Sequence, residues 1–147
     1  MLTLFSLDLS CLRLDSIDSN AFVFKSSENN KKLFIDLSNN RLNENSFPND
    51  FRIETNRRVD LNLNYNPFKR LNQSIFGDFL DSNHENSIQF WQNRDNTQID
   101  CDLCQTIWLK HYSSQISDTF CTDGNTFQTK QFFIEKCPQI KINRCKQ

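Results

Sequence analysis

Cysteine is the residue type whose number and spacing in this sequence could support chemistry. The chain has six cysteines, and five of them lie in its last third, at positions 101, 104, 121, 137 and 145. A C-x2-C pair followed by further cysteines could hold a zinc ion with four thiolates, or it could form disulfides. Structural zinc sites usually bring two close pairs, whereas Cys121, Cys137 and Cys145 are widely spaced and include no close pair. Disulfides are therefore the favoured interpretation, and they indicate an oxidising compartment.

The other reactive residue types form no recognisable catalytic pattern. His84 lies in the polar stretch DSNHENS and His111 follows a tryptophan, and neither has a nucleophile pattern nearby. The carboxylates are scattered, with no pair that favours acid–base work. Only two glycines occur, which argues against a glycine-rich phosphate loop. We expect a protein that is not an enzyme and that uses no cofactor.

Net charge and hydropathy narrow the partners further. The 17 basic and 18 acidic residues nearly cancel, which argues against nucleic acid as a partner. The small basic clusters NRR (56–58) and KRL (69–71) are expected to be solvated turns. No run of about 18 apolar residues exists, so we expect no membrane insertion by this chain itself.

A repeated pattern indicates how the chain is organised. Leu7, Ile35, Leu61 and Ile88 recur at nearly constant spacing, and each precedes a polar residue and then an apolar one. The copies read LFSLDLSCLRL, KLFIDLSNNRL, RVDLNLNYNPF and ENSIQFWQN. They approximate the template LxxLxLxxNxL, and only the first copy has Leu in slot 1.

The template predicts which side chains form the core. Slots 4 and 6 point to one side of a short strand because side chains alternate with period two. Slot 11 (Leu14, Leu42, Phe68) returns to the same core. Slot 9 is asparagine in three copies, where a buried amide can satisfy backbone groups of a turn; these residues are Asn40, Asn66 and Asn93, with Leu12 in the first copy.

This pattern resembles the leucine-rich repeat family, whose period is about 20–29 residues. The resemblance implies an α/β solenoid, with a short parallel sheet on the concave face and irregular turns or short helices on the convex side. Residues 1–93 would hold about four repeats, the last one degenerate, and residues 94–147 would form a separate cap. A single repeat cannot bury its own apolar face, so stability would come from stacking.

The stretch IDCDLCQTIWLKH resembles the C-terminal cysteine-rich cap of extracellular leucine-rich repeats. Cys101, Cys104, Trp108 and Leu109 match the cap pattern C-x-C-x-L-x-W-L, with C-x2-C in place of C-x-C. The resemblance implies that a helix carrying Ile107, Trp108 and Leu109 covers the last repeat. It also implies the disulfides Cys101–Cys121 and Cys104–Cys145, although Cys137 could replace Cys145, and Cys11 would be left over.

The resemblance implies an extracellular protein-recognition module, secreted or part of a membrane receptor, that binds a protein ligand or co-receptor. An alternative is a structural end cap for a longer array with its ligand site upstream, and a less favoured one is a zinc module. Slots 2, 3, 5, 7 and 8 would face the ligand, and the surface becomes aromatic toward the cap. The candidate ligand-binding residues are Phe34, Asp36, Asn62, Tyr65, Gln89 and Trp91.

Two further expectations concern the surface. Asn72-Gln73-Ser74 is a glycosylation acceptor pattern on the expected convex side. The apolar start MLTLFSLDLS lacks a basic region, so it resembles a repeat more than a signal peptide. We expect Met1 to lie within a larger repeat array. If Met1 is the true start, Leu2, Leu4, Leu7 and Leu9 would form an exposed edge that favours a homodimer.

Overall fold

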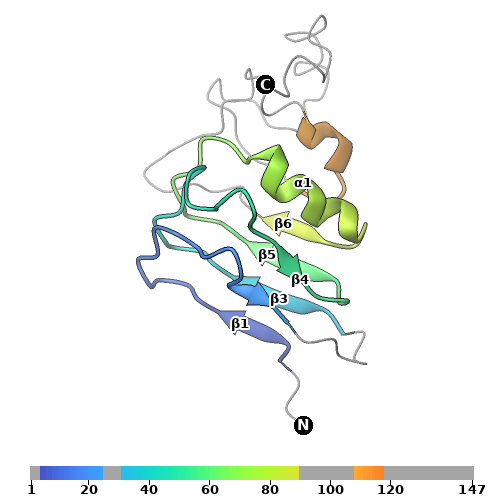
Figure 1. Ribbon diagram of the computed structural model, residues 1–147, viewed down its shortest axis with the longest axis horizontal. Coiled ribbons are helices and arrows are strands. Elements are labelled where there is room, and N and C mark those ends of the chain that lie inside the picture. The colour runs from blue at the N-terminus through green and yellow to red at the C-terminus, as the bar shows by residue number, and fades with distance from the viewer. Residues whose placement is uncertain (1–3, 25–30, 90–107, 118–147) are drawn as a thin grey trace, which may run out of the picture.

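The computed structural model describes residues 4–24, 31–89 and 108–117. Its main element is a parallel sheet of four strands, whose order in space is their order in the sequence (Figure 1). A second parallel sheet pairs β2 (Phe22–Val23) with β4 (Ile53–Glu54). Helix α1 (Gln73–Ser82) and a short 3-10 helix (Trp108–Tyr112) are the described helices. The strands of the main sheet are β1 (Ser6–Asp8), β3 (Leu33–Asp36), β5 (Val59–Asn62) and β6 (Ser87–Gln89).

The register of the main sheet matches the alignment predicted from the repeats. Leu7 lies opposite Ile35, Ile35 opposite Leu61, and Leu61 opposite Ile88. Ile35, Leu61 and Ile88 are fully buried, and Leu7 in the outer strand β1 is half-buried. The prediction of a mixed α/β structure with a short parallel sheet is therefore confirmed for the described residues.

Two buried asparagines join neighbouring repeats, as the slot-9 pattern predicts. Asn66 is fully buried; its Oδ1 accepts from Leu42 N at 3.0 Å, and its Nδ2 donates to Leu37 O at 2.9 Å and Leu63 O at 3.0 Å. Asn40 is equally buried and makes the corresponding bonds to the preceding repeat. Each amide thus satisfies backbone groups that the turn leaves unpaired. Asn93, the third predicted member, lies outside the described residues.

The side of the core away from the main sheet is built mostly from phenylalanine. The rings of Phe47 and Phe51 lie 4.9 Å apart, those of Phe47 and Phe76 5.1 Å, and those of Phe22 and Phe51 6.0 Å, all edge-to-face. Such pairs add to the stabilisation from burial alone. The returning segments that carry these rings form β2, β4 and α1. The β2–β4 pair was not anticipated, because two-residue strands carry no readable hydrophobic period.

One part of the predicted slot assignment was wrong. Slots 2 and 7 were expected to face a ligand, yet Leu33 and Val59 in slot 2 are fully buried in the core. Slots 2 and 4 are both even, so period-two alternation places them on the same inner side. In slot 7, Ser38 and Asn64 are 7% and 6% exposed. The surface that the repeats offer to a ligand is therefore narrower than the predicted one.

The segment Trp108–Ser117 covers the outer edge of β6. Ile116 forms a parallel bridge with Ile88, Ile88 N donates to Gln115 O at 2.8 Å, and Ser117 N donates to Ile88 O at 3.0 Å. Trp108 and Leu109 are both buried. An unpaired strand edge would otherwise remain exposed at this position. The segment Trp108–Ser117 thus contacts β6, whereas the cap as a domain stays a prediction, and Ile107 lies outside the described residues.

Candidate protein-binding face

Alternation along the strands assembles four of the predicted site residues. Asp36, Asn62 and Gln89 are directly opposite one another on neighbouring strands, and Phe34 lies two residues before Asp36 on the same side of β3. All four are half-buried, whereas the intervening Ile35 is fully buried. We call the surface formed by these four residues the sheet face; they are Phe34, Asp36, Asn62 and Gln89. Trp91, the sixth predicted residue, lies outside the described residues.

Three slot-5 side chains, those of Asp8, Asp36 and Asn62, each use one oxygen to hold the following turn. Asp8 Oδ1 accepts from Ser10 N at 2.9 Å, and Asp36 Oδ1 accepts from Ser38 N at 2.9 Å. Asn62 Oδ1 accepts from the backbone N–H two residues later at 3.1 Å. The Ser10 hydroxyl and then its backbone N–H lower the pKa of Asp8 below its ordinary value, since both bonds favour the carboxylate. These residues therefore have a structural role, whatever else they contact.

The charged side chains beside Phe34 are largely paired with one another. Lys32 Nζ lies 2.6 Å from Asp60 Oδ2, and Ser87 Oγ donates to Asp60 Oδ1 at 2.6 Å. The position opposite Phe34 on β5 is this same Asp60. An aromatic ring thus sits next to a paired ion on the sheet face, which is a common composition for a protein interface with a polar rim.

Tyr65 stands out at the end of β5 because of its backbone. Its φ is 60°, in the left-handed region that bulky residues seldom adopt. Cys11 and Asn39 occupy the same slot in the two earlier repeats, with φ of 59° and 55°. The turn therefore requires this conformation in all three repeats, and asparagine meets it at lower cost than tyrosine. Tyr65 is nevertheless 42% exposed.

A second unfavourable feature adjoins Tyr65 in the chain. Asn64 is 6% exposed, and its Oδ1 is buried with no hydrogen-bond partner. A buried unsatisfied acceptor destabilises a fold by about 1–3 kcal/mol. Residues 64 and 65 thus combine an orphaned acceptor with a strained backbone. Local violations of this kind are enriched at functional sites.

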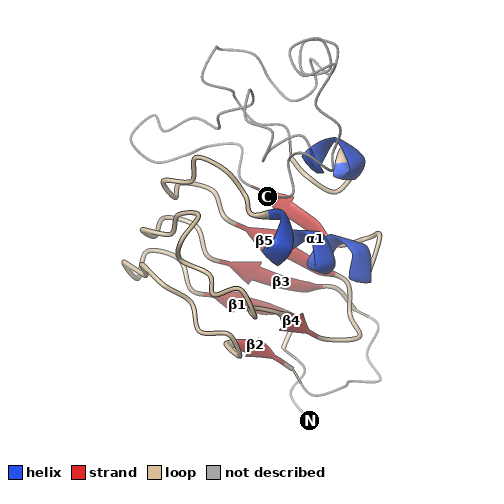
Figure 2. Cartoon of the chain, turned by 45° about the horizontal axis from the view of Figure 1, so that its top comes forward, coloured by secondary structure: helices blue, strands red, loops and turns tan. Residues whose placement is uncertain are grey.

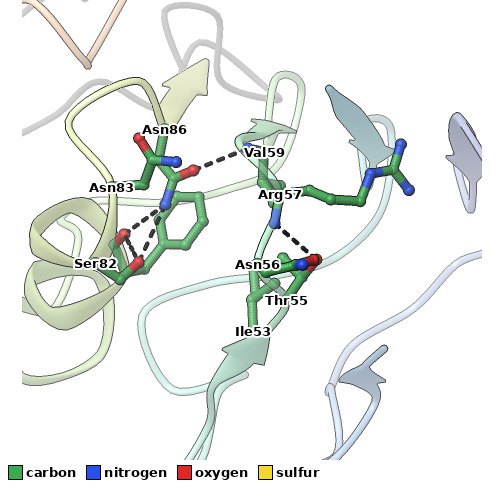
Figure 3. Close-up of a pocket in the computed structure, with 9 residues that line it drawn as sticks. Ile53, Thr55, Asn56, Arg57, Val59, Ser82, Asn83 and Asn86 are labelled. Carbon is green, nitrogen blue, oxygen red and sulfur yellow. Dashed lines mark hydrogen bonds between the residues drawn. The ribbon is translucent and has the colours of Figure 1, made fainter. Parts of the chain in front are cut away.

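One small pocket lies away from the sheet face, between the start of β5 and the end of α1 (Figure 3). Its volume is about 80 Å³, which is room for a few waters and far below the roughly 300 Å³ of typical ligand sites. Asn86 closes it: its Oδ1 accepts from Val59 N at 2.8 Å, and its Nδ2 donates to Phe79 O at 2.8 Å. The Arg57 side chain points away from these asparagine atoms. The pocket is a structural feature of the helix-to-strand return.

Three buried or bridging polar residues were not identified from the sequence. Arg57, predicted to be solvated, is 7% exposed and donates to Leu4 O, Lys31 O and Lys32 O at 2.6, 2.6 and 3.0 Å. Asn86 joins α1 to β5. Gln115 Nε2 donates to the carbonyls of residues 80, 83 and 86 at 2.9, 3.2 and 3.1 Å. No sequence signal marks them, because each role depends on carbonyls from separate segments.

The remaining predicted sites are only partly described. Cys11 is an exposed free thiol, while Cys101, Cys104, Cys121, Cys137 and Cys145 lie outside the described residues, so both disulfides stay predictions. Asn72 is the N-cap of α1, and its Oδ1 accepts from Ser74 N at 3.1 Å. A glycan on its Nδ2 would leave that bond intact. His84 and His111 are exposed.

Neither a metal cluster nor a membrane span is found in the described part of the chain. Among residues 4–24, 31–89 and 108–117, no three His, Cys, Asp or Glu side chains gather as metal ligands. No helix in these ranges is long and apolar enough to cross a bilayer. No protein-family model, curated protein or solved structure matches this chain.

Proposed function

We propose that this chain is a non-catalytic, extracellular protein-recognition module of the leucine-rich repeat type. The support for the repeat assignment is physical. Neighbouring strands pair in a parallel register set by the nearly constant repeat spacing, and buried asparagines of consecutive repeats bond to the preceding turn. Stacked repeats of this kind present one extended face made of equivalent positions. Protein ligands are the partners that fit such a face.

Tyr65 is the observation that carries the proposal. A tyrosine in the left-handed region costs stability that asparagine in the same slot would avoid. At 42% exposed, Tyr65 is also the most exposed of the described tyrosines and tryptophans, since Tyr112 is half-buried and Trp108 is buried. Exposed Tyr and Trp next to polar neighbours are the side chains that dominate binding energy at protein interfaces. We therefore assign Tyr65 as the anchor of a binding face that also includes the sheet face.

The test uses Asn39 as an internal template. Tyr65→Asn places in the third repeat the residue that the second repeat already carries with φ of 55°. The full chain, secreted and multimerised, is screened against an array of purified extracellular domains, and each binder is measured again with the variant. We expect Tyr65→Asn to weaken binding at least about thirtyfold, or about 2 kcal/mol, while stability is unchanged or higher.

The matched control is Asn72→Asp, which keeps the capping oxygen at the start of α1. It should bind as the parent does. An array partner that binds Tyr65→Asn as tightly as the parent would refute the assignment of Tyr65. If no extracellular domain on the array binds the parent chain, the recognition function itself is rejected.

A structural end cap is the second candidate function. The observation that favours it is the segment Trp108–Ser117, which pairs with the outer edge of β6 through Ile88 and buries Trp108 and Leu109. In that case the ligand site would lie elsewhere in a longer array. Tyr65→Asn would then leave binding by the longer protein intact, whereas disrupting the Trp108 packing would lower its stability.

A further inference from the structure

The end of the molecule opposite the covered β6 edge is apolar. Among the described residues, five large hydrophobic side chains are exposed, and all but Tyr65 belong to the first repeat: Leu4 (44%), Phe5 (47%), Leu12 (57%) and Val23 (46%). β1 and β2 are the outer strands of their two sheets at this end (Figure 2). A concentration of exposed apolar side chains on one end is the mark of an interaction surface.

The backbone of β1 is available on the same side. Leu9 N donates to Asp36 O at 2.8 Å, and Phe34 N donates to Phe5 O at 2.9 Å, so odd-numbered residues of this strand pair with β3. By alternation, Ser6 and Asp8 direct their N–H and C=O groups outward. An edge strand with free ladder groups is a template for another strand. The surface therefore offers hydrogen bonds as well as apolar contacts.

The chemistry of the edge favours an apolar occupant over another asparagine-bridged repeat. Asn40 and Asn66 each reach from their own repeat to the turn of the preceding one. The equivalent position in the first repeat is Leu12, which is 57% exposed. A leucine cannot satisfy the backbone of a neighbouring turn. It can, however, be buried against another apolar surface.

We propose that a second copy of this chain pairs with β1 in antiparallel orientation, about a two-fold axis at Leu7. In this register Ser6 faces the partner's Asp8, and the two outward-pointing residues exchange both ladder hydrogen bonds. Phe5 faces the partner's Leu9, which continues the core across the interface. Two-fold symmetry makes the same patch serve both copies.

Charge selects this register among its neighbours. A shift by two residues in one direction places Asp8 opposite the partner's Asp8, and like charges directly opposite are destabilising. A shift the other way places Asp8 opposite the partner's Leu4, which buries the carboxylate against an apolar side chain. A shift by one residue would turn the apolar side chains to the wrong face. Only the register centred on Leu7 avoids all three penalties.

Sedimentation equilibrium of the full chain tests the proposal, and we expect a monomer–dimer equilibrium. Ser6→Pro removes one outward N–H in each copy without touching the bonds to β3, so it should weaken the dimer at least about tenfold. Tyr65→Asn, after the end of β5, should leave the dimer unchanged, which separates this proposal from the recognition function. A chain that stays monomeric at all accessible concentrations would overturn the proposal, as would a dimer that Ser6→Pro does not weaken.

Cross-linking tests the register directly. In a Cys11→Ser background, Leu7→Cys places two thiols at the axis, where paired Cα atoms lie about 4.5 Å apart, within disulfide range. We expect a disulfide-linked dimer to form several-fold faster than with Asp8→Cys, the matched variant for the shifted register. Faster cross-linking of Asp8→Cys would contradict the proposed register.

Discussion

The replacement of Asn66 by leucine tests how strongly one amide holds two repeats together. Asn66 is fully buried, and leucine has nearly the same shape but no hydrogen-bonding atoms. The change removes the acceptor of Leu42 N and the donors to Leu37 O and Leu63 O. Leu37 O keeps a second bond, from Asn40 Nδ2 at 2.9 Å. Leu42 N–H and Leu63 C=O, both inside the core, lose the hydrogen bonds that Asn66 makes to them.

The magnitude follows from these two groups. Leaving a buried donor or acceptor unsatisfied costs about 1–3 kcal/mol each, so Asn66→Leu should lower the free energy of unfolding by about 2–6 kcal/mol. That is a large share of the roughly 5–15 kcal/mol that stabilises a typical domain. Urea unfolding, followed by tryptophan fluorescence and circular dichroism, measures the change, with the redox conditions held constant for parent and variant.

Asn45→Leu is the matched control for this measurement. Asn45 is exposed, so the same replacement there should change stability by no more than about 0.5 kcal/mol. The reasoning fails if Asn66→Leu costs less than about 1 kcal/mol, or no more than Asn45→Leu. Either result would mean that the buried amide is not what satisfies the turn between the second and third repeats.

Two further predictions concern α1 and the segment that packs on it. Burial, together with the hydrogen bond to Asp81 Oδ1 at 2.8 Å, raises the pKa of Tyr112 to about 12 from 10.0. The neutral phenol is therefore favoured in the folded chain, and its stabilisation, complete below pH 10, is lost as the pH rises through about 12. In a Tyr65→Phe background, where Tyr112 is the only tyrosine, the ultraviolet titration midpoint should fall when Asp81 becomes Asn; no shift would contradict the assigned bond. Gly77 is buried inside α1, and an added Cβ would meet only Gln73 Cγ, at 3.5 Å. Gly77→Ala should raise the free energy of unfolding by about 0.5–1 kcal/mol, and a loss of stability in urea unfolding would show that the site is tighter than the structure indicates.

The buried residues of the strands and the buried turn residues Asn40 and Asn66 could be predicted from the residues alone. The positions of Leu7, Ile35, Leu61 and Ile88 determine the strand register, because alternation with period two and a nearly constant repeat spacing leave little freedom. The sheet face follows from the same alternation. The disulfides, Trp91 and Asn93 stay predictions.

Other features depended on contacts that no local pattern records. Arg57 is buried because carbonyls from separate segments converge on its guanidinium. Gln115 donates to a carbonyl near the end of α1 because the fold brings the two segments side by side. Short strands such as β2 form only because their neighbours in space align with them. Sequence reasoning places such residues in solvent by default, since it sees their charge and polarity but not their partners.

The sequence by itself determined the repeat period, the strand register and the buried amides Asn40 and Asn66, because each is set by side-chain type at a fixed spacing. Only the tertiary structure decided that the slot-2 residues are core, that Tyr65 has a strained backbone, and that Arg57 is buried. These depend on which surfaces stack against which, and stacking is a property of the assembled chain rather than of any one stretch of it.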